Sequence, residues 1–161
     1  MNQGLVDAAY KEYNNGYYSE KLEEGLQFQD VATRELYKRG VVVVGYASRK
    51  FQNEEGENML GAEIKRDGMF RNTGNLYIEI CEKSHPSKPT YTASGIFRED
   101  NSWIFVIGDE KTMWIFSTKY LRIIKDRFRH VEKPTSKGFL IPLEMADKYC
   151  LRRIDVGVDN G

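Results

Sequence analysis

The sequence predicts a single mixed α/β domain, and three observations predict it. An amphipathic helical pattern comes first, a β-branched run and alternating segments follow, and a second amphipathic helix comes after them. This order of helix, strands and helix is typical of sheets packed against helices around one core. With 161 residues, of which 40% are hydrophobic, the chain is long enough to bury such a core.

The first helix is expected from Ser19 to Arg39, where apolar side chains recur with helical spacing and Gly40 stands at the C-terminal cap position. Residues 1–18 before it are polar and are expected to form a flexible arm. The segment VVVVGYA, residues 41–47, is a continuous β-branched run. Such a run is typical of a strand that is covered on both faces.

Two hairpins are expected next. In GAEIKRDGMFRNTGNLYIEI, residues 61–80, apolar and polar side chains alternate strictly on both sides of a turn rich in Gly and Asn. The segments SWIFVI and TMWIFS flank the turn GDEK and predict a second hairpin.

The C-terminal third is expected to alternate between helix and strand. Ser117 is placed to cap a basic helix, GFLIP predicts a short strand, and residues 143–150 predict a brief helix. The domain is therefore expected to span residues 19–150, with residues 151–161 as a frayed tail.

Composition limits the classes of function. Lys plus Arg and Asp plus Glu number 24 each, so the net charge is zero, which argues against a tail-driven nucleic-acid binder but allows a local basic surface. Two cysteines without a CxxC spacing favour a reducing, cytoplasmic setting. The sequence contains no run of 18 apolar residues, so it predicts no membrane-spanning helix.

Four ionisable residues within residues 61–80 form the candidate site, namely Glu63, Lys65, Asp67 and Glu79. Side chains two apart on a strand share a face, so the first three line one side and Glu79 can join them from the neighbouring strand. Several carboxylates beside a lysine provide the hard oxygen ligands that Mg²⁺ prefers, and Mn²⁺ can substitute for it. The ordinary alternative is a solvated strand face whose charges pair with one another.

These residues resemble the PD-(D/E)XK, or restriction-endonuclease-like, nuclease superfamily, most of all small phage and bacterial members with an EVKxD…TGNxxxE core. The matching segments are EIKRD, TGNLYIE and SGI at Ser94–Ile96, followed by EDNSWIFVIGD, and the resemblance covers roughly residues 20–130. It implies an α-β-β-β-α-β sandwich with a central mixed sheet flanked by helices. It also implies a magnesium-dependent DNA endonuclease, cytoplasmic in a bacterial host if phage-encoded, and a homodimer.

Two registers of the family motif fit the chain. In the first, Glu63 and Lys65 form the (D/E)xK pair, and Glu57 is the upstream acid that reaches in from the preceding loop. In this register Lys65 is the catalytic lysine.

In the second register, Asp67 is the upstream acid and Glu79 is the first member of the pair. Cys81 then occupies the place of the lysine, so Lys65 or Lys83 would have to supply the amine. Taken together, the two registers give a catalytic set of Glu63, Lys65, Asp67 and Glu79, and metal ligands Asp67, Glu79, Glu63 and Glu57.

Basic residues outside the motif are candidates for contact with the DNA backbone. The helix after Ser117, TKYLRIIKDRFRH, is rich in Lys and Arg, and such a face can follow phosphates. The candidate DNA-binding residues are Arg49, Lys50, Gln52, Lys88, Lys119 and Arg122. The alternatives to an active nuclease are a catalytically degenerate nucleic-acid-binding member of the same fold and a non-enzymatic interaction protein.

Overall fold

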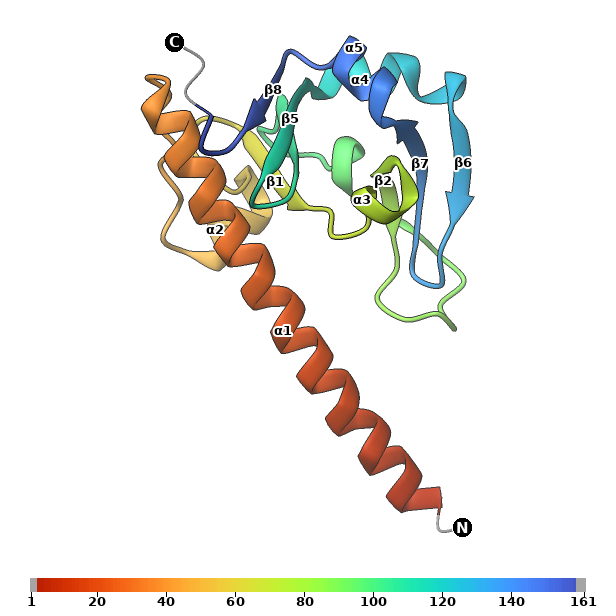
Figure 1. The fold of residues 1–161 in the computed structure, drawn as a ribbon. Helices are drawn as coiled ribbons and strands as arrows, with labels where there is room; N and C mark the ends of the chain where they lie inside the picture. Colours follow the sequence, from red (N-terminus) through yellow and green to blue (C-terminus); the bar gives the residue numbers. More distant parts are fainter. Residues whose placement is uncertain (1–2, 159–161) are drawn as a thin grey trace.

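A computed structural model describes residues 3–158, and these residues form a mixed α/β fold, as the sequence predicts (Figure 1). The helices are α1 (Gln3–Lys38), α2 (Arg49–Glu55), α3 (Phe70–Thr73), α4 (Thr118–Ile124) and α5 (Leu143–Tyr149), with 3-10 turns η1 (Gly95–Phe97) and η2 (Lys125–Arg127). The strands are β1 (Ala62–Arg66), β2 (Asn75–Glu82), β3 (Thr92–Ala93), β4 (Ile104–Gly108), β5 (Thr112–Ser117), β6 (Arg129–Glu132), β7 (Ser136–Pro142) and β8 (Arg152–Asp155). Within the described residues, no helix has the length and apolar character needed to cross a membrane.

The strands form two four-stranded sheets where the sequence indicated one central sheet. The first has the order β1-β4-β5-β8 and is mixed, because β1 runs parallel to β4 while the other neighbours are antiparallel. The second has the order β3-β2-β7-β6 and is antiparallel throughout. We call them the mixed sheet and the antiparallel sheet.

The hairpin expected over residues 61–80 is wrong, although both of its strands exist. β1 and β2 belong to different sheets, because α3 and the left-handed Gly74 that ends it turn the chain between them. β1 pairs instead with β4, and a parallel pair requires the long crossover that this segment supplies. The hairpin of β4 and β5 is confirmed, as are the strand β7 and the helix α5.

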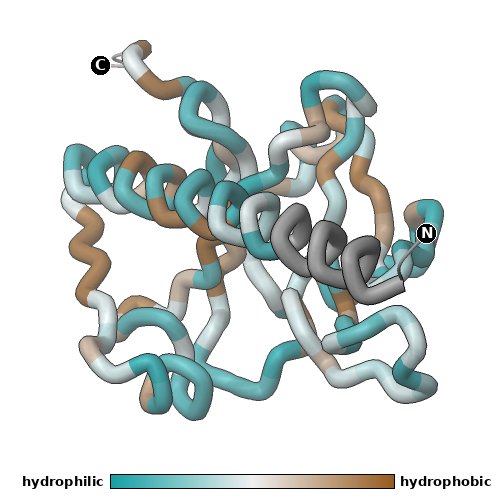
Figure 2. The backbone as a smooth tube through the Cα atoms, turned by 90° about the horizontal axis from the view of Figure 1, so that it is seen from below, coloured by the Kyte–Doolittle hydropathy of each residue, from teal (hydrophilic) through white to brown (hydrophobic). Residues whose placement is uncertain are grey.

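The valine run at residues 41–47 is not a buried strand, so this prediction is wrong. Its only ladder contact is a single bridge between Gly45 and Asn58. Val42 and Val44 are 60% and 49% exposed. The run is the hydrophobic segment that follows α1 in Figure 2, and it stays outside both sheets because β-branched residues form a strand only where a neighbouring strand pairs with them.

Both ends of the chain are more regular than expected. α1 is helical from Gln3, so a helix start near Ser19 is wrong, and its N-terminal half projects away from the sheets (Figure 1). Strand β8 pairs with β5 within the expected frayed tail, residues 151–161. Residues 1–2 and 159–161 of these predicted end segments lie outside the described residues.

Two apolar cores flank the mixed sheet and fix the direction of the charged side chains on β1. One core lies between α1 and the sheet and includes Phe28 and Ala32 of the helix with Ala62 and Ile64 of β1. The other joins the mixed and antiparallel sheets with α4 and α5. Because side chains alternate along a strand, residues 63 and 65 point away from α1.

Candidate functional site

A cleft of about 1500 Å³ is lined by α1, the segment around α2, β1 and β2. The predicted site residues that line it are Glu57, Lys65, Asp67 and Glu79. The two sheets therefore contribute different members of the predicted set to the same cleft.

Glu63, Lys65 and Glu57 come together as the first register requires. The Lys65 Nζ atom lies 3.2 Å from Glu63 Oε1 and 3.8 Å from Glu57 Oε1. The Glu63 side chain is only 2% exposed, whereas that of Lys65 is 45% exposed. The lysine therefore links a buried carboxylate to the open cleft.

Asn58 brings Glu57 to this position, and sequence reasoning missed it. Its side-chain amide donates to the carbonyl of Ala62 at 2.7 Å and accepts the N–H of the same residue at 3.0 Å. These two bonds close a tight loop before β1, in which Gly61 has a φ of 74°. Asn58 is buried, and in the sequence only its position shortly before the expected strand hints at this role.

The cluster holds more negative charge than Lys65 neutralises. Glu57 Oε2 and Glu63 Oε2 are both buried without a hydrogen-bond partner. The pKa of Glu63 is raised from 4.5 to about 7, chiefly by burial; the charge of Lys65 opposes this rise and the charge of Glu57 adds to it. Burial acts to lower the pKa of Lys65, but the surrounding carboxylates outweigh it, so this pKa lies above 10.5. The cluster therefore contains carboxylate oxygens that the described residues leave without a partner.

Glu79 is held on the β2 side of the cleft by the segment SGI. The Ser94 hydroxyl donates to Glu79 Oε1 at 2.7 Å. Gly95 has a φ of 51°, and a Cβ there would lie 2.2 Å from the Glu79 carbonyl oxygen, so glycine permits this close approach. The pKa of Glu79 lies above its usual value because of burial. The Ser94 hydrogen bond and the charges of Lys65 and Lys133 offset this rise only in part.

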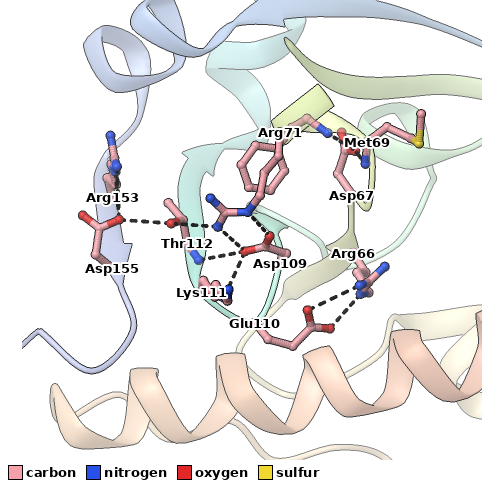
Figure 3. Close-up of polar contacts among 11 residues, drawn as sticks. Arg66, Asp67, Met69, Arg71, Asp109, Glu110, Lys111, Thr112, Arg153 and Asp155 are labelled. Atoms are coloured by element: carbon pink, nitrogen blue, oxygen red, sulfur yellow. Dashed lines mark hydrogen bonds and ion pairs between the residues drawn. The ribbon is translucent and has the colours of Figure 1, made fainter. Parts of the chain in front are cut away.

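Asp67 has a structural role in its observed contacts. Its Oδ1 atom accepts the N–H group of Met69 at 2.8 Å (Figure 3) and that of Phe70 at 3.1 Å. Its Oδ2 atom accepts the N–H group of Tyr77 at 2.9 Å. The carboxylate thereby fixes the start of α3 and ties it to β2. To act as a metal ligand, Asp67 would have to weaken these bonds.

The complete predicted ligand set is not assembled as one cluster. Within the described residues, no three or more His, Cys, Asp or Glu side chains are grouped so that they alone could hold a metal ion. In the structure, a bulge separates Glu79 from Cys81, which occupies the lysine position of the second register. Lys83 lies over the ring of Tyr91, 4.8 Å from its centroid. The contacts of Glu57, Glu63 and Lys65 therefore favour the first register.

Of the six candidate DNA-binding residues, Arg49 and Gln52 line the cleft. The Gln52 side chain is engaged with the carbonyl of Tyr46. Lys50 instead lines a separate shallow pocket on α2, and Lys88 lies on an exposed loop.

The basic helix after Ser117 is shorter than expected. Ser117 caps it as predicted, but α4 ends at Ile124 and β6 begins at Arg129. Lys119 is exposed, and the Arg122 Nε atom donates to a backbone carbonyl of η1 at 2.5 Å. Neither residue lines the cleft. Contact of these two residues with DNA stays a prediction.

Ion pairs tie the walls of the cleft together. Arg66 at the end of β1 pairs with Glu24 of α1 at 3.2 Å and with Glu110 of the β4–β5 turn at 2.7 Å. Arg71 of α3 makes a second set of bonds to Asp109 in the same turn (Figure 3). The turn thereby connects α1, β1 and α3.

The chain has no significant match among known protein families, characterised proteins or solved structures. Function is therefore inferred from the side chains of the cleft and from the segments EIKRD and TGNLYIE.

Replacing Asp67 by Ala should destabilise the fold, because three backbone N–H groups lose their acceptor. We expect the free energy of unfolding to fall by about 2–4 kcal/mol in a denaturant titration. Asp30→Ala, at an exposed carboxylate of α1, is the control and should change it by less than about 0.5 kcal/mol. A stability of Asp67→Ala equal to that of the control would contradict the structural role.

Burial of Glu63 should make stability depend on pH. Because the pKa of Glu63 is raised from 4.5 to about 7 in the folded protein, its stabilising contribution is fully present below pH 4.5 and is lost as the pH rises through about 7. Without divalent cations, the free energy of unfolding should fall over this window by up to about 3 kcal/mol. Glu63→Gln should lack the part of this fall that Glu63 contributes, so its free energy of unfolding should differ less between pH 5 and pH 8 than that of the parent.

Glu82→Gln, which changes an exposed carboxylate of β2, is the matched control and should keep the pH dependence of the parent. If the free energy of unfolding changes with pH in the same way in Glu63→Gln and in the parent, Glu63 is ionised over this pH range in both the folded and the unfolded state.

Proposed function

We propose that the cleft is the active site of a metal-dependent phosphodiester hydrolase that acts on DNA. One observation carries the proposal: Glu57 and Glu63 each present a buried, unpartnered oxygen beside the half-exposed ammonium of Lys65. Burying unpartnered carboxylate oxygens costs free energy, and a bound cation is one way in which a fold offsets that cost.

Mg²⁺ fits this donor set, and Mn²⁺ can substitute for it. Magnesium keeps several waters and is commonly bound through one or two carboxylates together with the phosphate of a substrate. Glu57 and Glu63 are the two carboxylates that would hold it, so a third protein ligand is not required. When bound, the ion would neutralise charge on the phosphate and lower the pKa of a coordinated water.

The remaining residues have separate roles in the proposal. The Lys65 ammonium faces the cleft and stabilises the negative charge that builds up on the phosphate in the transition state. Glu79, held in place by Ser94 on the opposite side, is positioned to orient or deprotonate a water molecule. Its raised pKa makes Glu79 a stronger proton acceptor than an ordinary carboxylate.

The finer fold and the partners belong to the same proposal. The mixed sheet with α1 on one face is the part that we compare with the restriction-endonuclease-like sandwich. The resemblance of EIKRD and TGNLYIE to that superfamily supports DNA as the substrate and a homodimer as the assembly. Arg49, which lines the cleft, is the candidate for contact with the DNA backbone.

Lys65→Ala should lower the rate of DNA cleavage about 100-fold or more while leaving DNA binding nearly unchanged, because its charge matters most in the transition state. The measurement is single-turnover cleavage of linear and branched DNAs in Mg²⁺, Mn²⁺ or EDTA, paired with a binding titration in Ca²⁺. Lys148→Ala removes an exposed lysine of α5 outside the cleft and should cut as fast as the parent. Cleavage by Lys65→Ala at the parental rate would remove Lys65 from the catalytic set.

Mg²⁺ should raise the melting temperature of the parent, since a ligand at 100 times its Kd stabilises the folded state by about 2.7 kcal/mol. The double variant Glu57→Gln/Glu63→Gln removes both carboxylates, so Mg²⁺ should leave its melting temperature unchanged. The double variant Glu54→Gln/Glu55→Gln, at the exposed end of α2, should respond like the parent.

The absence of any shift with Mg²⁺ or Mn²⁺, together with the absence of cleavage, would contradict the hydrolase. The degenerate nucleic-acid binder would then be the better interpretation if DNA still binds, and the interaction protein if it does not.

A further inference from the structure

One face of the antiparallel sheet opens into the cleft. Ile78 packs into the core, so Tyr77 and Glu79 on either side of it point the other way. In the register of the sheet, Tyr77 lies opposite Leu140 of β7, which lies opposite Arg129 of β6. Residues directly opposite each other share a face, so these three form a row across the sheet beside Glu79.

Tyr77 is fixed on this face as a flat aromatic surface. A Cβ at Gly138 would lie 2.7 Å from the Tyr77 ring, so the ring rests directly on the backbone of β7. Its hydroxyl lies 2.9 Å from the Ser136 Oγ atom. The Lys133 ammonium lies over the ring, 3.5 Å from its centroid. The ring therefore has a fixed orientation, and the flexible Lys133 side chain covers its face in the absence of a ligand. A base that stacks on this face would displace the Lys133 ammonium, which could then pair with a phosphate.

An aromatic ring with a cation over it, close to a proposed phosphodiester-cleaving centre, suits a nucleobase and its phosphate. Bases inside a duplex are covered on both faces by their neighbours, so only an unpaired base can stack on a ring within a cleft. Lys133 lines the cleft together with Tyr77, so its ammonium is the cation that a phosphate of the stacked nucleotide would meet.

We propose that Tyr77 and Lys133 form a platform on which one unpaired base of a single-stranded nucleic acid stacks, with the base against the Tyr77 ring and its phosphate toward Lys133. The proposal rests on the proposed function for the nature of the substrate. It makes the preferred substrate a single strand, or a duplex with an unpaired base, and does not depend on cleavage.

The other face of the same sheet offers a matched control. Tyr91 carries two lysines over its ring, Lys137 at 4.5 Å and Lys83 at 4.8 Å from the centroid. Lys137 precedes Gly138 on β7 and therefore points away from the cleft. Neither Tyr91 nor Lys137 lines the cleft, although the chemistry of the pair is the same.

The experiment is a binding titration of the full chain with a fluorescent oligothymidylate in Ca²⁺, which avoids cleavage. Tyr77→Leu should lower the affinity about tenfold or more, the usual effect of losing one stacked base. Tyr77→Phe keeps the ring and should stay close to the parent, and Tyr91→Leu should be unchanged. A fully paired duplex should bind the parent and Tyr77→Leu equally, and circular dichroism checks that each variant is folded.

An oligomer of abasic nucleotides separates stacking from charge. It should bind the parent more weakly than the thymidylate does, and it should lose no further affinity in Tyr77→Leu. An equal loss for abasic and normal oligomers would overturn the stacking platform, as would unchanged binding of the thymidylate by Tyr77→Leu or no binding by the parent.

The outcomes also separate this proposal from the hydrolase. Binding that depends on Tyr77 without cleavage in Mg²⁺ or Mn²⁺ would support the platform and contradict the hydrolase. Cleavage of single strands at the parental rate and affinity by Tyr77→Leu would support the hydrolase and overturn the platform.

Discussion

The buried carboxylate of Glu63 is the constraint on which the cleft depends. One of its oxygens meets Lys65, and the other has no partner. Glu57 adds a second negative charge at the same point. A single lysine that is also half exposed to solvent offsets this charge only in part, so the arrangement is unfavourable in the isolated chain. A cation that enters the cluster would relieve it, which links the stability of the fold to the proposed chemistry.

The surrounding structure holds this unfavourable cluster in place. Ala62 and Ile64 anchor β1 in the core against α1, and they alternate with the charged residues, so the charges stay at the cleft unless the strand unpacks. Asn58 fixes the chain before β1, and Asp67 fixes it afterwards. Glu79 comes from the antiparallel sheet, which shares its apolar core with the mixed sheet. The shared core therefore sets the separation between the two sides of the site.

Local features of the fold could be predicted from the sequence, and long-range pairing could not. The β4–β5 hairpin and the Ser117 cap were predictable because their signals act over a few residues. Period-2 alternation identified β1 and β2 but not their partners, because the same pattern fits any neighbouring strand. The valine run at residues 41–47 shows the same limit, since high β-propensity does not supply a strand for it to pair with.

For the candidate site, the sequence by itself determined that Glu63 and Lys65 share a face, because they lie two residues apart on one strand. Only the tertiary structure decided what joins them. The Asn58 clamp brings in Glu57, and the close approach at Gly95 lets Ser94 hold Glu79. The backbone N–H groups that engage Asp67 belong to α3 and β2, so its role follows from how the chain turns between the two sheets.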